Sequence, residues 1–225
     1  MGEHDQSSAD LDWRDGQIPV SRRFDDPYFS LNGGLEETRH VFLSGNDLPQ
    51  RLQSGFHVAE LGFGTGLNLL ALARIATQPI HFTSFEAFPM SLEELARAHA
   101  AFPELADLSA QLREGWPSRR FAVGMVQAEI IEADARDALP DWQGRADAWF
   151  LDGFSPAKNP ELWGEDLMTQ VARHTAPGGT FATYTAAGHV RRALAAAGFS
   201  VERAPGFAGK RHMSRGVLAA DLGDA

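Results

Sequence analysis

The sequence predicts an α/β fold, in which helices flank a doubly wound and mostly parallel sheet. Two observations support this prediction. From residue 56 onward, short apolar strands alternate with helical segments, and the connections between them are short. One of these connections, residues 62–66, carries a glycine at every second position and leads from a strand into a helix. Ligands of such sheets bind at the carboxyl ends of the strands, so we expect the functional site there.

The composition fits a folded domain of ordinary polarity. The 225 residues are 44% hydrophobic and 22% charged, which allows a substantial core. The longest apolar stretches fall short of the roughly 20 residues of a membrane span, and the acidic N-terminus lacks the features of a secretory signal. The chain has no cysteine, which excludes disulfides, thiolate metal sites and a cysteine nucleophile. We expect a cytoplasmic protein that uses neither a membrane nor a metal.

The N-terminal quarter differs from the rest of the chain. We expect residues 1–12 to form a disordered tail, because they are mostly polar. Residues 13–50 contain dense turn signals and predict an N-terminal extension with one or two short strands. Residues 51–225 then form the α/β domain.

Local patterns predict the elements of this domain. Apolar runs bounded by turn residues indicate strands, and longer runs without such breaks indicate helices. We expect strands over 56–61, 80–85, 126–131, 147–151, 180–185, 199–202 and 214–219, and helices over 67–76, 160–175 and 188–197. Ser91 begins a further helix, because Glu94 follows it at the spacing of a capping box. The last two strands fit a hairpin, so the predicted sheet has seven strands.

The glycine loop after the first strand narrows the class of ligand. Gly62, Gly64 and Gly66 stand at alternate positions, and Glu60 precedes them. A dinucleotide fingerprint, G-x-G-x-x-G/A, needs a small residue at the position that Leu67 occupies. The spacing G-x-G-x-G, with an acid before it, is typical of Rossmann-like methyltransferases that bind S-adenosyl-L-methionine. In that case Glu60 meets the methionine end of the cofactor, directly or through water. A tight turn without a ligand is the alternative.

Acids at the next two strand ends strengthen the cofactor prediction. Glu86 lies 20 residues beyond Gly66, at the offset of the acid that binds ribose hydroxyls in both cofactor classes. Asp134 ends the third strand, where methyltransferases place an acid for the adenine amino group. A single strand-end acid is more often a helix cap or a solvated charge, but here three successive strands carry one. We therefore expect S-adenosyl-L-methionine as the cofactor, with Asn68 in the same binding set. The expected fold is the Rossmann-like class I methyltransferase fold.

A carboxylate also ends the fourth strand. Asp152 follows the apolar run 148–151, and the residues from Gly153 to Pro156 cannot continue it as ordinary strand or helix. This position adjoins the first strand and the methyl donor. A carboxylate there can orient an attacking amine, accept its proton and stabilise the cation that forms, so Asp152 is the candidate catalytic residue. A cap on the following helix is the alternative.

Candidates for substrate binding follow Asp152 and recur near the C-terminus. Phe154 can form an apolar wall or stack on a base, and Lys158 stands on a loop stiffened by prolines. The net charge of the chain is −10, yet residues 186–216 hold six Lys and Arg against one acid. A solvated basic face and a landing site for phosphate both fit this run. Its candidate phosphate ligands are Arg191, Arg192, Lys210 and Arg211.

At these residues the sequence resembles a known family. The segments FLDGFSPAKNP, ELGFGTGLNLL, SFEAFP and GFAGKRHMSRGV, with the N-terminal DGQIPVSRRFDDPYFSLNGG, are similar to the methyltransferase domain of the MnmC family, over about residues 13–218. The resemblance implies methyl transfer from S-adenosyl-L-methionine to the 5-aminomethyl group of the tRNA wobble uridine. The product is 5-methylaminomethyl-(2-thio)uridine. It also implies that Asp152 is the catalytic aspartate, that the basic run faces tRNA, and that the extension around residues 26–29 and Asn32 folds over the cofactor.

The resemblance leaves three alternatives open. Bifunctional members of the family continue into a flavin-dependent oxidase domain, whereas this chain ends at Ala225 with no second glycine fingerprint. We expect a standalone form acting on tRNA that carries 5-aminomethyl-(2-thio)uridine at the wobble position, although part of a longer protein fits equally. A small-molecule amine methyltransferase of the same fold is the second alternative, which the net acidity favours. A non-catalytic cofactor-binding module is the third.

Overall fold

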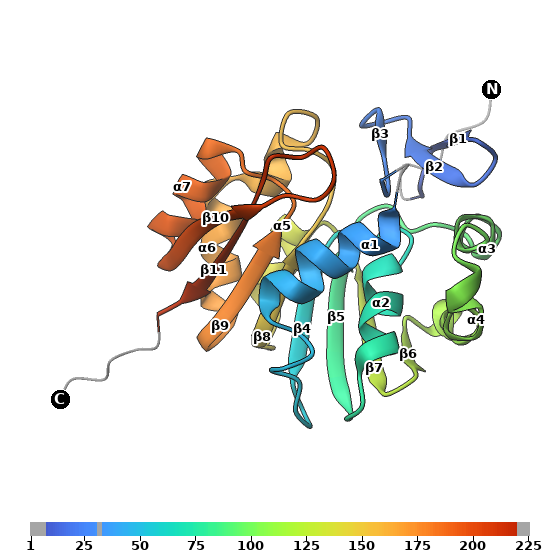
Figure 1. Ribbon diagram of the computed structural model, residues 1–225, viewed down its shortest axis with the longest axis horizontal. Helices are drawn as coiled ribbons and strands as arrows, with labels where there is room; N and C mark the ends of the chain where they lie inside the picture. Colours follow the sequence, from blue (N-terminus) through green and yellow to red (C-terminus); the bar gives the residue numbers. More distant parts are fainter. Residues whose placement is uncertain (1–7, 31–32, 220–225) are drawn as a thin grey trace.

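One large sheet with helices on both faces forms the body of the protein (Figure 1). The computed structural model describes residues 8–30 and 33–219. The strands of this sheet pair in the order β10-β11-β9-β8-β4-β5-β7-β6. Their bounds are β4 (His57–Leu61), β5 (Ile80–Glu86), β6 (Arg120–Val123), β7 (Val126–Glu132), β8 (Ala146–Leu151), β9 (Thr175–Thr183), β10 (Phe199–Pro205) and β11 (His212–Leu218).

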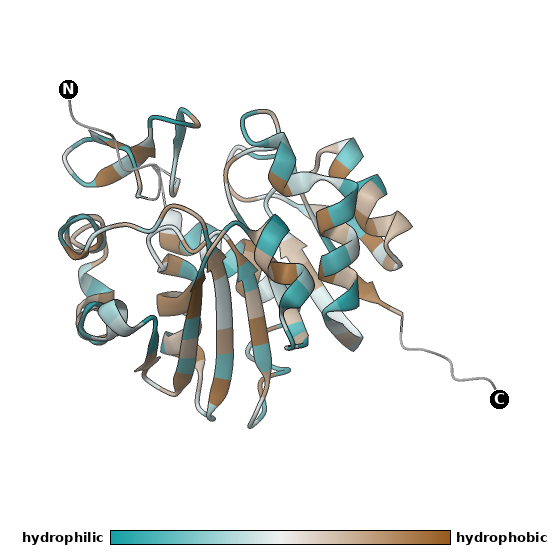
Figure 2. Cartoon of the chain, turned by 180° about the vertical axis from the view of Figure 1, so that it is seen from behind, coloured by the Kyte–Doolittle hydropathy of each residue, from teal (hydrophilic) through white to brown (hydrophobic). Residues whose placement is uncertain are grey.

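Helices cover the sheet in two layers. The α-helices are α1 (Gly34–Thr38), α2 (Leu67–Ile75), α3 (Leu92–His99), α4 (Ala106–Gly115), α5 (Ala135–Ala138), α6 (Glu165–Arg173) and α7 (Gly188–Ala196). Residues of β8 alternate between two cores, because successive side chains of a strand point to opposite faces. Ala148 and Phe150 pack in the core of α1 and α2, whereas Trp149 and Leu151 pack in that of α6 and α7. Figure 2 shows the mixed apolar and hydrophilic surface of the helices beside the more apolar strands.

The central strands confirm the predicted fold class. β9, β8, β4, β5 and β7 pair in parallel, so their carboxyl ends share one edge of the sheet. The helix after Ser91 begins as predicted, since the Ser91 hydroxyl accepts from the Glu94 amide and the Glu94 carboxylate accepts from the Ser91 amide. β10 and β11 form the expected antiparallel hairpin, and β11 joins the sheet antiparallel to β9.

The prediction of seven strands is wrong, because the sheet has eight. The additional strand, β6, pairs antiparallel with β7 through the two-residue connection Gly124-Met125. Only four residues long and partly exposed at the sheet edge, β6 has an apolar run of just three residues, 121–123, which is too short to predict a strand. An ion pair of 2.5 Å between Arg120 and Glu129 joins it to β7. Helix α4, just before β6, was not predicted either.

The region around residues 160–183 also differs from prediction. The expected single helix 160–175 is divided into a 3-10 turn (Pro160–Trp163) and α6, with Gly164 in an extended conformation between them. β9 begins at Thr175 rather than 180, because the segment with Pro177 and two glycines continues the strand through an irregular register against β8. In the sequence, a proline and glycines within a strand of irregular pairing give the same signal as a loop.

The N-terminal extension builds a second, smaller sheet. Its strands are β1 (Leu11–Arg14), β2 (Ile18–Ser21) and β3 (Asp26–Pro27), one more than expected. The expected tail lies partly and Asn32 wholly outside the described residues, and Leu11 already belongs to β1. After β3, α1 continues through a π-helical turn (Arg39–Leu43) and packs on the main core through Leu35 and Phe42. Within residues 8–30 and 33–219, no helix combines the length and apolar character that crossing a membrane requires.

Candidate active site

A cavity of about 350 Å³ lies at the carboxyl ends of β4, β5, β7 and β8. This volume is in the range of small-molecule sites. The N-terminal extension supplies part of its wall, including Phe24, Tyr28 and Glu37. The residues predicted from the sequence that line it are Gly62, Gly64, Asn68, Glu86, Asp134, Asp152, Phe154 and Lys210. The predicted residues that do not line it are Glu60, Gly66, Lys158, Arg191, Arg192 and Arg211.

The glycine loop brings bare backbone to the cavity wall. Gly62 and Gly64 have φ angles of 78° and 53°, in the left-handed region that favours glycine. A Cβ atom on Gly62 would lie 3.3 Å from the Cα of Gly153, and one on Gly64 would lie 3.0 Å from the Tyr28 ring. Side chains are therefore excluded here, and the loop can approach a ligand closely. Gly66 stands behind the wall as the N-cap of α2.

Glu86, at the end of β5, braces this loop. Its Oε2 accepts from the Gly64 amide at 2.8 Å, and its Oε1 accepts from the Phe88 amide at 2.7 Å. Burial raises the pKa of Glu86, and the backbone hydrogen bonds oppose that shift. A carboxylate has about four acceptor sites, so capacity remains for a ligand hydroxyl.

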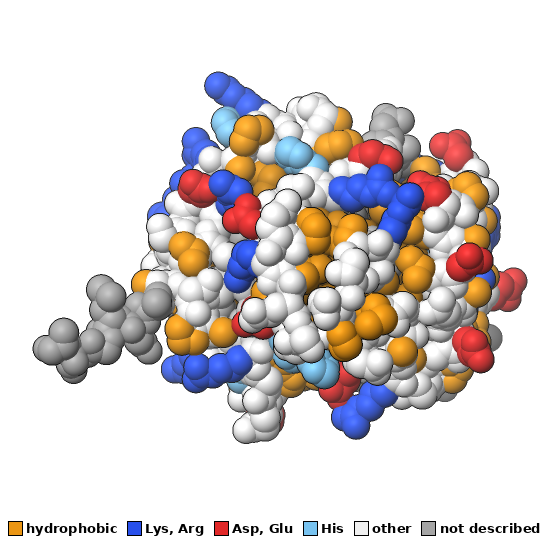
Figure 3. All heavy atoms as spheres, turned by 60° about the horizontal axis from the view of Figure 1, so that its bottom comes forward, with side chains coloured by type: hydrophobic (Ala, Val, Ile, Leu, Met, Phe, Trp, Pro, Cys, Tyr) orange, Lys and Arg blue, Asp and Glu red, His pale blue; other side chains and the backbone are white. Residues whose placement is uncertain are grey.

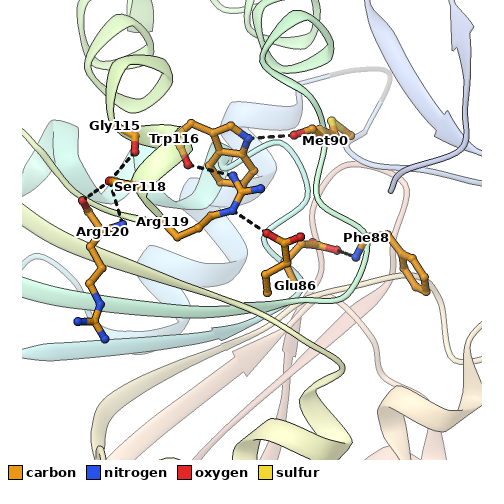
Figure 4. A network of polar contacts seen from close by, with 9 residues as sticks. Glu86, Phe88, Met90, Gly115, Trp116, Ser118, Arg119 and Arg120 are labelled. Carbon is orange, nitrogen blue, oxygen red and sulfur yellow. Dashed lines mark hydrogen bonds and ion pairs between the residues drawn. The ribbon is translucent and has the colours of Figure 1, made fainter. Parts of the chain in front are cut away.

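A hydrogen-bond network supports the segment after β5 from the side of α4 (Figure 4). The Trp116 indole donates to the Met90 carbonyl at 2.9 Å, and the Trp116 carbonyl accepts from Arg119 at the same distance. The Trp116 ring also stacks on Phe63 of the glycine loop, with 4.9 Å between centroids. This wall of the cavity is therefore fixed from behind.

Asn68, near the start of α2, connects two carboxylates. Its Nδ2 donates to Glu60 Oε1 and to Asp152 Oδ2, both at 2.8 Å, while its Oδ1 accepts from Thr38 at 3.0 Å. Glu60 is fully buried and also accepts from the Ser84 hydroxyl at 2.6 Å. Burial raises the pKa of Glu60 well above its ordinary value, against the effect of these two hydrogen bonds. Glu60 therefore orients Asn68 from behind the cavity wall.

Asp152 lies directly after β8 and its carboxylate borders the cavity. Its Oδ1 accepts from the Gly153 amide at 2.8 Å, and its Oδ2 accepts from Asn68. Burial raises the pKa of Asp152 to about 6, while these hydrogen bonds oppose the shift; the charge of Glu37 raises the pKa further and that of Lys210 lowers it. The next helical turn starts at Pro160, eight residues beyond Asp152, with Asn159 at its N-cap position, so Asp152 caps no helix there. It is an ionisable group with basicity above that of an ordinary aspartate.

Aromatic rings from the extension pack over the loop after β8. The Phe154 ring stacks on Phe24, with centroids 4.6 Å apart, and meets Tyr28 edge-on at 4.9 Å. The backbone of this loop is held by the Trp163 indole, which donates to the Phe154 carbonyl, and by the Tyr184 hydroxyl, which donates to the Gly153 carbonyl. These bonds are 2.9 and 2.8 Å long. Phe154 thus contributes an apolar wall, with one face covered by Phe24.

Lys158 connects the same loop to the extension. Its ammonium lies 3.1 Å from the Asp25 carboxylate and 3.9 Å from that of Asp26, and it donates to the Asp25 carbonyl. The Ser155 amide adds a bond of 2.9 Å to Asp26 Oδ2. The sequence suggested that Lys158 is presented to a substrate, whereas in the structure it holds two segments of the protein together.

Asp134 lines the cavity and also caps α5. It accepts from the Arg136 amide at 2.9 Å and from the Arg136 guanidinium at 2.7 Å. The side-chain hydrogen bond from Arg136 is the main reason that the pKa of Asp134 is lowered. Asp134 therefore caps a helix, which was one interpretation of the sequence, and it also lines the cavity.

The basic run of the C-terminal quarter is divided by the fold. Lys210 donates to Glu37 at 2.6 Å, and Arg215 pairs with Glu202 at 2.5 Å. Arg192 and Arg211 are exposed, whereas Arg191 is half-buried and its Nε has no hydrogen-bond partner among the described residues. On the face that Figure 3 shows, which is the bottom of Figure 1, Lys and Arg are interspersed with Asp and Glu.

Sequence reasoning missed several residues of the cavity. Tyr184 follows β9 directly, so the strand-end rule that found Asp152 could have found it too. Glu37 and Thr38 stand on α1 in the extension, where no periodic pattern or strand end marks them. Within the described ranges, no group of three or more His, Cys, Asp or Glu side chains is placed to hold a metal ion.

Comparisons with known proteins identify the family of the chain. A family described as S-adenosyl-L-methionine-dependent methyltransferase matches residues 103–219. The tRNA 5-methylaminomethyl-2-thiouridine biosynthesis bifunctional protein MnmC of Chromobacterium violaceum is 47% identical over 231 residues, and that of Aliivibrio fischeri is 43% identical over 238. These alignments cover 95% and 94% of this chain but 35% of either relative, so the chain spans about a third of their length.

Solved structures share the fold. MnmC2 from Aquifex aeolicus superposes with a TM-score of 0.73 at 22% identity, covering 96% of this chain and 72% of that one. A precorrin-6y C5,15-methyltransferase from Geobacter metallireducens gives a TM-score of 0.54 at 15% identity, covering 91% and 94%. At these identities the likeness concerns the fold.

Proposed function

Because the chain belongs to the S-adenosyl-L-methionine-dependent methyltransferases, we propose that it methylates the 5-aminomethyl group of a tRNA wobble uridine, giving 5-methylaminomethyl-(2-thio)uridine. The observation that carries the reaction type is the Asp152 carboxylate, which borders the cavity with a pKa raised to about 6. Similarity to the MnmC proteins along nearly the whole chain supports the substrate. The proposed partner is tRNA with 5-aminomethyl-(2-thio)uridine, and the proposed place of action is the cytoplasm.

The residues of the cavity fit S-adenosyl-L-methionine. Gly62 and Gly64 carry no side chain, and a Cβ atom on either would crowd Gly153 or Tyr28. The bare backbone of this loop allows a ligand to bind closely against it. Glu86 keeps acceptor capacity for ribose hydroxyls, and Asp134 for the adenine amino group. When bound, the cofactor supplies an electrophilic methyl group that a neutral amine can take up.

Asp152 is proposed to take the proton of the amine. An alkylamine resembles the lysine side chain, whose pKa is about 10.4, so it reaches the site as an ammonium without a free lone pair. The raised pKa of Asp152 brings the carboxylate nearer to that of the amine and makes it a better base. Asn68 and Gly153 fix its two oxygens and leave each with a further lone pair for the substrate.

Exposed cations are proposed to hold the tRNA backbone. Arg192 and Arg211 lie outside the cavity and carry no ion pair among the described residues, so both are available for phosphate. Arg191 precedes Arg192 on α7 and is half-buried, so we propose it as a secondary member of this set, although its Nε is buried. Phe154 is proposed to bound the pocket of the uracil base. Lys158 and Lys210 are engaged by acids of the extension, so we propose Lys210 no longer as a phosphate ligand and Lys158 no longer as a substrate ligand.

The proposal is tested by methyl transfer from labelled S-adenosyl-L-methionine to two tRNA pools. One pool comes from cells that lack this modification step and accumulate 5-aminomethyluridine, and the other from cells that complete it. We expect label in the first pool alone, at the wobble nucleoside after digestion. Incorporation should weaken steeply with added salt, because Lys and Arg contacts to phosphate release counterions.

Two outcomes would overturn the proposal. Equal labelling of both pools would place the methyl group on another nucleoside. The absence of labelled tRNA, with the cofactor bound tightly and the protein folded, would favour a small-molecule amine as the substrate.

A further inference from the structure

The Lys210 ammonium makes two contacts at the cavity wall, although this residue belongs to the loop between β10 and β11. Its Nζ lies 2.6 Å from Glu37 Oε1 and 4.7 Å from the centroid of the Tyr184 ring. Both partners line the cavity, as Lys210 itself does. A carboxylate and an aromatic face are the two groups with which proteins recognise an alkylammonium ion.

These partners are fixed by the rest of the protein. Glu37 is only 9% exposed, and its second oxygen accepts from the Ser30 hydroxyl. The Tyr184 hydroxyl donates to the Gly153 carbonyl, so the ring is anchored to the residue next to Asp152. The charge of Glu37 raises the pKa of Asp152 and that of Lys210 lowers it. Both groups therefore lie close enough to Asp152 to influence its charge.

We propose that Glu37 and the ring of Tyr184 form the recognition site for the substrate amine, and that the Lys210 ammonium occupies this site until the substrate displaces it. The inference rests on the proposed function, because it assumes an amine substrate. It assigns Glu37 and Tyr184 to amine binding, and it assigns to Lys210 the part of an internal competitor.

Displacement of Lys210 is physically easy. Its side chain is 48% exposed, so the ammonium can move into solvent, and the cost of breaking the pair lies in uncovering the carboxylate of Glu37, whose side chain is 11% exposed. Its loop contains Gly206 and Gly209, and Gly209 has no neighbour within 4 Å of a Cβ position. A departing lysine is rehydrated, whereas the buried Glu37 carboxylate needs a new cation in its place. An uncharged analogue cannot supply one, so the site selects for an amine.

Binding of a small probe tests this inference without turnover. The probe is the nucleoside 5-aminomethyluridine, titrated by calorimetry into the protein saturated with S-adenosylhomocysteine; 5-hydroxymethyluridine serves as its uncharged counterpart. The variants are Lys210→Met, which keeps the apolar stem, and Glu37→Gln, which can still accept from Ser30. Arg203→Met removes another exposed cation from the same hairpin and is the matched control.

We expect Lys210→Met to tighten binding of the amine three- to tenfold, because the competitor is gone, and Glu37→Gln to weaken it at least tenfold. Neither change should alter binding of the hydroxymethyl analogue by more than twofold, and Arg203→Met should match the unaltered protein for both probes. Weaker amine binding by Lys210→Met would overturn the inference, since Lys210 would then be a substrate ligand. So would unchanged amine binding in both variants while methyl transfer to tRNA persists. Absence of methyl transfer in the unaltered protein refutes the proposed function instead.

Discussion

The two sides of the cavity are built in different ways. On the cofactor side, backbone amides of a short loop, a strand-end glutamate and a stacked Phe63–Trp116 pair make contacts within or between regular elements. On the substrate side, the contacts join segments far apart in sequence, such as Asp26 with Ser155 and Glu37 with Lys210. The first side is buried and held by backbone bonds, so it is preformed. The second depends on contacts with partly exposed side chains such as Lys210, so we expect it to be the side that opens.

Asp152→Asn should have the largest effect and separates the two sides most clearly. The amide keeps the shape of the carboxylate and an acceptor for Asn68, but it cannot take a proton from an amine. General base catalysis contributes about 10² to 10⁴-fold, so we expect kcat to fall by that order. Cofactor affinity, measured by calorimetry, should stay within twofold. Loss of cofactor binding in this variant would contradict the division between the two sides.

Gly62→Ala should damage the cofactor side. The methyl group would lie 3.3 Å from Gly153 at a φ of 78°, and strain of this kind costs on the order of 1–3 kcal/mol. We expect about tenfold weaker binding of S-adenosyl-L-methionine and a lower Tm. Gly178→Ala is the control, because Gly178 has a similar φ of 73° with nothing within 4 Å of its Cβ position. Equal cofactor affinity in the two variants would show that the loop does not approach the ligand closely.

The pH profile reports on the boundary between the two sides. As the proposed base, Asp152 must be ionised, and its pKa of about 6 predicts activity above this pH and its loss as the pH falls through it. We expect kcat/KM to decline about tenfold per unit below pH 6. Burial of the charged form also costs stability, since a raised carboxyl pKa makes the folded state bind more protons than the unfolded state between pH 4 and 6. Asp152→Asn should therefore be more stable than the unaltered protein at pH 8, by thermal denaturation, and lose that advantage near pH 4.

Lys158→Met should have the smallest effect and tests the substrate side alone. The lysine and Asp25 side chains are 37% and 86% exposed, so their pair contributes under about 1 kcal/mol. We expect a two- to fivefold rise in KM for tRNA through loosening of the loop on the extension, with cofactor affinity unchanged. A tenfold change in cofactor affinity would mean that this contact supports both sides of the cavity.

The same contrast explains what the sequence could predict. The glycines and the carboxylates of Glu86 and Asp152 stand at strand ends, where one local pattern gives both the element and the position. The exposed edge strand β6 and the turn within 160–164 carry no such pattern, because pairing and packing decide them. Glu37 reaches the cavity only through the packing of α1, and the partner of Lys210 could not be inferred from a basic run. A positive charge in sequence indicates nothing about which acid the fold brings to it.

The stacked rings of Phe24 and Phe154 have a consequence for the speed of the enzyme. They join the extension to the loop after β8 beside the cavity, together with the contacts of Lys158 and Ser155 with the same extension. Aromatic contacts of this kind contribute about 0.5–1.5 kcal/mol each, which is small enough for frequent opening. If parting of these rings limits release of the spent methyl donor, turnover falls as the viscosity of the solvent rises.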